Sequence, residues 1–210
     1  MSKPDSDPTE NTGHTARHLR ITAPSGWVTR FAPLVRDGGT VLDLAAGGGR
    51  HGRYFLARGH PVTFVDRDTG PLIDLVGGKH AEVIAVDLED GGAWPLPGRT
   101  FDAIVVTNYL HRPLFPAIIG ALAEGGVLIY ETFARGNEEY SRPRNPDHLL
   151  KAGELIDIAR GRLQVVAYEH GIKSETPLPG VVQRICAIND LSRSARGDNE
   201  PPPHPLKAVP

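Results

Sequence analysis

Four glycines and an aspartate stand together in the stretch "DLAAGGGRHG", residues 43–52. Gly47, Gly49 and Gly52 have the spacing of a dinucleotide-binding turn, in which glycine lets a ligand approach the backbone and the next helix presents its amino terminus. Asp43 precedes the first glycine by four residues, and its carboxylate would repel a pyrophosphate but attract a cation such as an α-ammonium group. S-adenosylmethionine carries that ammonium and lacks a pyrophosphate. The alternative for Asp43 is a cap on the turn's own N–H groups.

Two further aspartates end apolar runs in "VTFVDRD" and "VIAVDLED". Asp66 stands at the offset from the glycines where an acidic residue binds both ribose hydroxyls. Asp87 can accept a hydrogen bond from the amine of an adenine, and Leu88 can offer its N–H and its side chain to the ring. NAD and S-adenosylmethionine share the ribose and the adenine. These residues therefore predict an adenosine-type ligand without choosing between the two cofactors.

The elements that must position these residues follow from alternating patterns. Apolar runs rich in Val and Ile predict strands, and the stretches between them have helical spacing and end on glycine. The expected strands are 40–45, 61–66, 81–87, 101–108 and 126–133, and the expected helices are 49–59, 69–78 and 112–126. Such alternation predicts βαβ units, with a parallel sheet covered by helices on both faces.

The pattern changes after the fifth strand. A long loop over 134–153 leads to an expected helix at 154–161. Two strands, 163–171 and 181–190, then follow with only "IKSETPLPG" between them, which is too short for a parallel crossover. We therefore expect an α/β protein with three layers, doubly wound around a mainly parallel seven-stranded sheet with a reversed last strand, a Rossmann-like fold.

Length and composition indicate one globular domain. The chain has 210 residues, of which 40% are hydrophobic and 23% charged, and no apolar run is long enough to span a bilayer. The predicted domain covers 21–191, between a flexible N-terminal arm at 1–20 and a disordered, Pro-rich tail at 192–210. The first residues lack the apolar segment of a secretory signal, so a cytoplasmic location is the default.

Charge and metal-ligand spacing narrow the partners. A formal net charge of −2 gives no reason to expect a nucleic-acid partner. A single cysteine, Cys186, excludes an internal disulfide and multi-cysteine metal sites. The nine histidines show no metal-ligand spacing, so no metal is predicted. The oligomeric state is left open.

Over residues 21–191 the sequence resembles the class I S-adenosylmethionine-dependent methyltransferases. The resemblance rests on "VLDLAAGGGRHG", "VTFVDRD", "VDLED" and "FDAIVVTNYLH", together with the reversed last strand. More narrowly, the chain looks like the small bacterial group that includes tellurite-resistance and thiopurine-type methyltransferases. The resemblance implies that the methionine portion of the cofactor is held by Asp43, Ala45, Gly47 and Gly49, with Arg50 near its carboxylate. It implies that Asp66 binds the ribose and that Asp87 and Leu88 bind the adenine. It also implies that Asn108 faces the methyl-sulfonium region.

The exit of the fourth strand bears on the acceptor. The family's DNA amino-methyltransferases carry Asn-Pro-Pro-aromatic there, whereas this chain has "TNYLHR", which argues against methylation of adenine or of a glutamine amide. Methyl transfer is an in-line displacement that depends on alignment, and a base is needed only where the acceptor must lose a proton. Tyr109 and His111 are the candidates to orient or deprotonate the acceptor. Alternatively, Tyr109 only lines the pocket and His111 caps the next helix.

The long connection at 134–153 predicts a lid or binding loop. Its candidate substrate residues are Arg135, Arg142 and Arg144, which could neutralise an anionic acceptor, and Tyr140, which could stack on a ring. Glu131, at the end of the strand before it, either hydrogen-bonds in the pocket or pins the loop. The alternative is a solvated loop with incidental arginines.

These observations lead to four hypotheses. The main one is an S-adenosylmethionine-dependent methyltransferase that acts on a small-molecule acceptor. The second is an RNA or protein methyltransferase, which the lack of a recognition domain or basic extension disfavours. The third is an NAD(P) oxidoreductase, which Asp43, the reversed strand and the absence of a Tyr-x-x-x-Lys pair disfavour. The fourth is a non-catalytic binding module with the same pocket.

Overall fold

The computed structural model describes residues 21–174, 179–194, 197–198 and 200–206. The predicted N-terminal arm lies outside the described residues, and the predicted tail is described only in part. In the part that is described, no helix is both long enough and apolar enough to cross a membrane.

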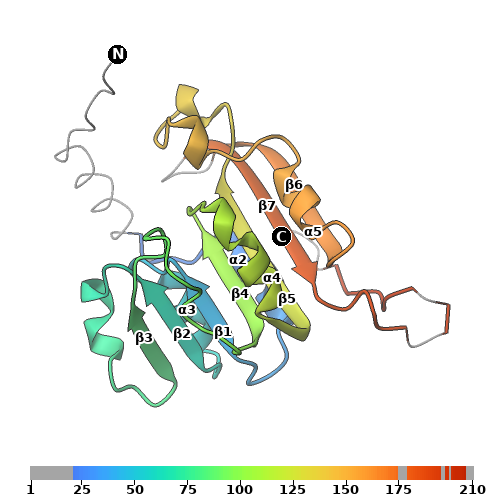
Figure 1. Cartoon of the computed structure of the whole chain (residues 1–210), viewed down its shortest axis with the longest axis horizontal. Helices are drawn as coiled ribbons and strands as arrows, with labels where there is room; N and C mark the ends of the chain where they lie inside the picture. Colours follow the sequence, from blue (N-terminus) through green and yellow to red (C-terminus); the bar gives the residue numbers. More distant parts are fainter. Residues whose placement is uncertain (1–20, 175–178, 195–196, 199, 207–210) are drawn as a thin grey trace.

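The centre of the molecule is a seven-stranded sheet with the order β3-β2-β1-β4-β5-β7-β6 (Figure 1). Its strands are β1 Val41–Leu44, β2 Val62–Asp66, β3 Ala81–Ala85, β4 Phe101–Thr107, β5 Leu122–Phe133, β6 Gln164–Lys173 and β7 Gly180–Ile188. The first five pair in parallel, whereas β7 runs antiparallel to both β5 and β6. The predicted doubly wound α/β sheet with a reversed last strand is therefore confirmed.

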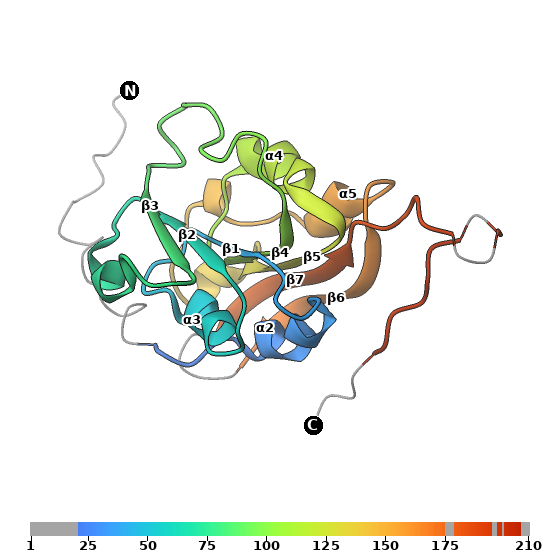
Figure 2. The ribbon, with the colours of Figure 1, turned by 90° about the horizontal axis from the view of Figure 1, so that it is seen from below.

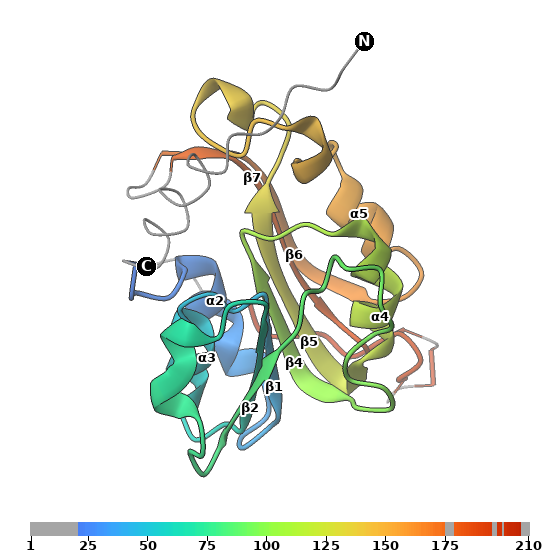
Figure 3. The ribbon, with the colours of Figure 1, turned by 60° about the vertical axis from the view of Figure 1, so that its left-hand side comes forward.

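Helices cover both faces of this sheet. Helices α2 (Gly26–Phe31) and α3 (Arg50–Leu56) lie on one face, while α4 (Phe115–Gly120) and α5 (Glu154–Ala159) lie on the other (Figures 2 and 3). Strand residues alternate between two apolar cores, because successive side chains point to opposite faces. In β4, for example, Val105 packs with α2 and α3, and Ile104 packs in the core that includes residues of α4 and α5.

Two expected helices differ from the structure. The 69–78 pattern gives a 3-10 helix over Gly70–Leu75. In the 112–126 pattern, a 3-10 helix (Arg112–Leu114) and α4 are followed by β5, so the helix expected beyond residue 121 was wrong. There the amide of Phe101 donates to the carbonyl of Ala121, and Leu122 pairs with Phe101 before the register shifts. Pairing with a neighbouring strand replaced the helix that local spacing suggested.

Helix α2 was not expected from the sequence. It begins after Ser25, whose hydroxyl accepts a hydrogen bond from the Trp27 amide as an N-cap. Trp27 and Phe31 then fill the core on this face, with 2% of each residue exposed. The helix also brings Ser25 beside the end of β5, where its hydroxyl donates to Glu131 Oε1 at 3.1 Å.

The long connection after β5 is anchored at both ends. Ala134 and Leu150 form a parallel bridge, and the Arg135 amide donates to the carbonyl of Leu150. Within it, the side-chain Nδ2 of the buried residue Asn137 donates to the backbone carbonyls of Ser141 and Pro143. The connection is therefore folded upon itself at the same edge of the sheet as the carboxyl end of β5 (Figure 1).

Candidate functional site

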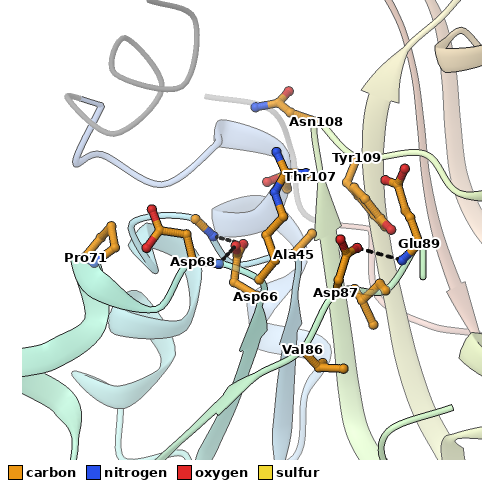
Figure 4. Close-up of a pocket in the computed structure, with 13 residues that line it drawn as sticks. Ala45, Asp66, Asp68, Pro71, Val86, Asp87, Glu89, Thr107, Asn108 and Tyr109 are labelled. Carbon is orange, nitrogen blue, oxygen red and sulfur yellow. Dashed lines mark hydrogen bonds between the residues drawn. The ribbon is translucent and has the colours of Figure 1, made fainter. Parts of the chain in front are cut away.

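A cavity of about 270 Å³ lies at the carboxyl ends of the parallel strands. In open α/β sheets this edge is where ligands bind. Its walls come from the segments that follow β1, β2, β3 and β4, which the parallel pairing brings together (Figure 4). The lining residues are Ala45, Gly47, Asp66, Arg67, Asp68, Pro71, Val86, Asp87, Leu88, Glu89, Thr107, Asn108 and Tyr109.

In the glycine turn after β1, the backbone amides of Gly47, Gly49 and Gly52 donate hydrogen bonds to acceptors within the protein. The amide of Gly47 donates to Asp66 Oδ2 at 2.7 Å, that of Gly49 to the carbonyl of Ala46 at 2.8 Å, and that of Gly52 to Asp43 Oδ2 at 2.8 Å. A turn that binds a pyrophosphate directs such N–H groups at the phosphate oxygens. In this chain the three amides of the fingerprint are already bonded to internal acceptors, so the glycine spacing does not make a phosphate cradle.

The second and third glycines serve close packing. Gly49 has a φ of +71°, and a β-carbon there would lie 2.6 Å from Leu72. At Gly52 a β-carbon would overlap the ring of Phe64 in β2. These glycines let α3 lie directly against the sheet, and so place the start of α3 beside the cavity.

Asp43 is buried behind the turn, with 2% of the residue exposed. Burial raises the pKa of its carboxyl to about 7, although the hydrogen bond from Gly52 and the charge of Arg50 act in the opposite direction. It accepts a hydrogen bond from the Gly52 amide, as the capping alternative expects. Asp43 is not among the lining residues, and direct contact with an ammonium group stays a prediction.

The predicted ribose and adenine residues do line the cavity. Asp66 accepts hydrogen bonds from the amides of Gly47 and Asp68, and Asp87 accepts one from the amide of Glu89. Each carboxylate oxygen has two acceptor sites, so these side chains retain capacity for a ligand. Leu88 lies beside them. The structure therefore brings together the strand-end aspartates of β2 and β3.

The cavity is strongly acidic. Among the residues that the structure describes, four carboxylates line it, and Arg67 is the only lining cation. The four are Asp66, Asp68, Asp87 and Glu89. Such a lining favours a cationic ligand and opposes one that carries phosphates. The sequence patterns did not identify Glu89, Arg67 or Thr107 as site residues, although Glu89 stands two residues after Asp87 in "DLED".

Two residues at the cavity have left-handed backbones. Ala45 and Asn108 both have a φ of +55°, which is uncommon for residues other than glycine and is tolerated best by Asn and Asp. Backbone strain of this kind persists where the surrounding structure fixes it, and it gathers at binding sites. At Asn108, the amide donates to the carbonyl of Glu131, which holds the exit of β4 against β5.

Tyr109 points into the cavity towards Asp87 and Glu89 (Figure 4). Burial, and then the negative charge of Glu89, raises the pKa of its phenol far above neutral pH. Its hydroxyl is buried and has no hydrogen-bond partner in the described part of the chain. The neutral phenol can therefore donate to a ligand, but it is a poor source of phenolate base.

The other predicted catalytic residue, His111, is not among the lining residues. Its carbonyl accepts from the Leu114 amide, and its side chain makes no cap hydrogen bond to the 3-10 helix that follows. The structure therefore brings Tyr109, but not His111, to the cavity.

A second, smaller cavity of about 30 Å³ lies next to the first and shares Asn108 with it. Its lining residues are Ile21, Ser25, Arg50, Asn108, Glu131, Phe133, Lys173 and Val182. Arg50 and Glu131, both predicted from the sequence, lie here. Ser25 and Lys173 were missed, because they arrive from α2 and the far end of β6.

The predicted loop residues lie elsewhere. Arg135, Tyr140, Arg142 and Arg144 are exposed, and none lines either of these two cavities. A substrate role for them stays a prediction. Within the described ranges, no three His, Cys, Asp or Glu side chains gather in a group that could hold a metal ion.

No family model and no curated protein matches the sequence, but solved structures do match the fold. TehB from Haemophilus influenzae is 17% identical with a TM-score of 0.67, over 84% of this chain and 66% of that one. The Burkholderia thailandensis 1,6-didemethyltoxoflavin-N1-methyltransferase, solved with its substrate and S-adenosylhomocysteine, is 18% identical with a TM-score of 0.57, over 90% and 93%. A TehB-like methyltransferase from Corynebacterium glutamicum is 21% identical with a TM-score of 0.57, over 87% and 100%.

The lengths of these proteins differ. The chain spans about two thirds of the length of H. influenzae TehB, and nearly all of the length of the two others. Each match includes most of this chain. The chain therefore has the fold of the S-adenosylmethionine-dependent methyltransferases.

Proposed function

We propose that this protein is an S-adenosylmethionine-dependent methyltransferase that acts on a small-molecule acceptor. The observation that carries the proposal is the acidic cavity beside a glycine turn in which the amides of Gly47, Gly49 and Gly52 are already bonded to Asp66, a backbone carbonyl and Asp43. A dinucleotide needs free amides and few carboxylates there, whereas a cationic sulfonium with an ammonium group fits four lining carboxylates. The fold of the methyltransferases named above supports this choice.

The chain's own residues fit such a cofactor in the following way. Asp66 would accept from the ribose hydroxyls, and Asp87 with Leu88 would hold the adenine. Ala45 and Gly47 would line the methionine portion, whose carboxylate Arg50 would face. When bound, the cofactor supplies a methyl group whose bond to sulfur breaks with the electron pair remaining on sulfur. Thr107 and Asn108 lie at the exit of β4, where the two cavities meet.

Tyr109 would orient the ligand rather than remove a proton. The phenol of Tyr109 is buried and stays neutral. The backbone carbonyl of Tyr109 accepts a hydrogen bond from the hydroxyl of Tyr130 in β5 at 2.8 Å. This bond fixes the backbone at the exit of β4. Catalysis would then rest on alignment of the acceptor with the sulfonium methyl, which in-line displacement requires.

The proposal is tested by calorimetric titration with S-adenosylhomocysteine and with NAD. We expect the first to bind in the micromolar range, about −8 kcal/mol, and the second not to bind. Asp66→Asn should weaken S-adenosylhomocysteine binding about 10- to 100-fold, because it removes hydrogen bonds to a charged group. Asp157→Asn on α5 makes the same change of charge outside the cavity and should leave the dissociation constant unchanged. Binding of NAD alone would overturn the proposal.

The class of acceptor is tested separately. Protein loaded with a donor bearing a radiolabelled methyl group should transfer the label to members of a small-molecule panel. It should not transfer the label to bulk RNA or to denatured protein. Transfer to either macromolecule instead would support the second hypothesis and contradict a small-molecule acceptor.

A further inference from the structure

The two adjoining cavities have opposite charge. Within the described part of the chain, the larger one is lined by four carboxylates and a single guanidinium. The described residues that line the smaller one include two cations, Arg50 and Lys173, and one carboxylate, Glu131. Asn108 belongs to both linings, so the change of sign occurs across one residue. A ligand that extends from the first cavity into the second therefore passes from a negative to a positive lining.

Two cations lie near Glu131 without a close ion pair: Lys173, which lines the smaller cavity, and Arg184, which does not line it. Lys173 Nζ lies 3.7 Å from Glu131 Oε1, and Arg184 Nη1 lies 3.5 Å from Glu131 Oε2, with side-chain exposures of 19%, 17% and 3% for the lysine, arginine and glutamate. Both distances exceed a charge-assisted hydrogen bond of about 2.8 Å. Arg184 is also shared with Glu169, at 3.5 Å. Among the described residues that line the smaller cavity, Glu131 is the one carboxylate, and Lys173 is paired with it, whereas Arg50 donates to the carbonyl of Ala23 at 3.1 Å.

The positive charges of Arg50 and Lys173 also act on a neighbouring histidine, His51. His51 is 2% exposed, and its Nδ1 lies 3.2 Å from the hydroxyl of Thr107. Burial lowers its pKa to about 3, and the charges of Arg50 and Lys173 act in the same direction. His51 is therefore neutral at physiological pH and does not add to the cationic charge. The excess of positive charge belongs to the arginine and the lysine.

Glu131 also has an unused acceptor. Its Oε1 accepts from the hydroxyl of Ser25 at 3.1 Å, but its Oε2 is buried without a hydrogen-bond partner among the described residues. Arg184 Nη1, at 3.5 Å, offsets part of its charge without a hydrogen bond, and a buried carboxylate oxygen that accepts no hydrogen bond is costly. A ligand that brings an N–H or O–H group into the cavity would satisfy it.

We propose that the smaller cavity is the acceptor subsite, and that it receives a carboxylate with an N–H or O–H donor on the adjacent atom. The acceptor's carboxylate would lie on Lys173, because Arg50 would face the carboxylate of the cofactor, and the donor would bond to the Glu131 carboxylate. At about 30 Å³ the cavity has room for little more than such a group, since one water needs about 10–15 Å³. This inference rests on the proposed methyltransferase function and names the class of its acceptor.

The test uses fragments that separate the two features. Glycolate has the carboxylate and the donor, acetate lacks the donor, and ethylene glycol lacks the charge. Each is titrated into ¹⁵N-labelled protein saturated with S-adenosylhomocysteine, and the amide signals of Asn108 and Glu131 are followed. We expect saturable shifts with glycolate, at least fivefold weaker binding of acetate, and no binding of ethylene glycol.

Variants of the lysine identify the site. Lys173→Met should weaken glycolate at least tenfold, and Lys173→Arg should restore most of the affinity, because the charge is retained. Lys79→Met, at the opposite edge of the sheet, removes an exposed lysine and should have no effect. All three variants should bind S-adenosylhomocysteine as the wild type does, which shows that each is folded.

The outcomes separate the two proposals. If the wild type fails to bind S-adenosylhomocysteine, the proposed function is wrong. If it binds the cofactor but no glycolate shift saturates, or if Lys173→Met binds glycolate as the wild type does, only the acceptor subsite is wrong. Equal binding of acetate and glycolate would overturn the role given to Glu131.

Discussion

At the scale of single residues, burial and the charge of Arg50 act in opposite directions on the pKa of the Asp43 carboxyl. Burial raises the pKa of its carboxyl from 3.8 to about 7, even though the amide of Gly52 donates to it. Between about pH 4 and pH 7 the unfolded chain therefore releases a proton that the folded chain keeps. The contribution of this group to the free energy of unfolding is fully present below about pH 4 and is lost as the pH rises to about 7.

Asp43→Asn should remove this pH dependence, because an amide cannot ionise and its oxygen still accepts from Gly52. Relative to the wild type, the variant should gain up to about 4 kcal/mol in free energy of unfolding as the pH rises from about 4 to about 7. Urea denaturation of both proteins across this range measures the difference, in which the other titrating groups cancel. A constant difference would contradict the raised pKa.

The residues of the larger cavity could be predicted where they end parallel strands. Asp66 ends β2 and Asp87 follows β3, and the carboxyl ends of parallel strands meet at one edge, so their proximity follows from the fold class. Ser25 and Lys173 could not be predicted. Their approach to Glu131 depends on helix α2 and on the residue at which β6 ends, and no local sequence pattern predicts the helix or that strand end.

At the scale of elements, the contact between α3 and β2 depends on Gly52. A β-carbon at this position would overlap the ring of Phe64, which is fully buried in the middle of β2. Neither the helix nor the strand can move easily, because both border the cavity and the core. The third glycine of the fingerprint is therefore a packing residue in this chain.

Gly52→Ala should lower the free energy of unfolding by about 2–3 kcal/mol or more, as overpacking of a core does. Adding Phe64→Leu should recover part of this loss, because the smaller side chain makes room. Gly59→Ala is the control, since it has a φ of +85° and open space around it, and should cost only about 1 kcal/mol. Thermal or urea unfolding measures all three, and equal losses at both glycines would contradict the packing role.

Element prediction succeeded where chain length limited the alternatives. The connection between β6 and β7 is too short for a crossover, and the predicted antiparallel pair is found. It failed over 122–126, where helical spacing continued into residues that pair with β4. There the partner strand decides the structure, and spacing alone contains no information about that partner.

At the scale of the whole molecule, the end of the chain returns to the sheet. Asp190, just after β7, is 1% exposed, and its carboxylate lies 2.6 Å from Nε2 of His204. This pair joins the region after residue 200 to the end of the central sheet. Composition predicts a disordered tail, and it contains no information about a single histidine that lies beside a buried carboxylate of the sheet.

His204→Ala should lower the free energy of unfolding by about 1–3 kcal/mol, because it removes the partner of a buried carboxylate. His170→Ala, at an exposed position of β6, is the matched control and should change it by less than about 0.5 kcal/mol. Urea denaturation at neutral pH compares the two. Equal stability of both variants would show that Asp190 does not depend on this histidine.

Because Asp43 and Asp66 accept from amides of the glycine turn, the chain's own carboxyl groups occupy N–H groups that a dinucleotide-binding turn would direct at phosphates. The turn is therefore pre-organised before any ligand arrives, and its ordering entropy belongs to folding rather than to binding. It also follows that adding glycines would not convert this protein to a dinucleotide enzyme. Such a conversion would have to begin by removing two carboxylates.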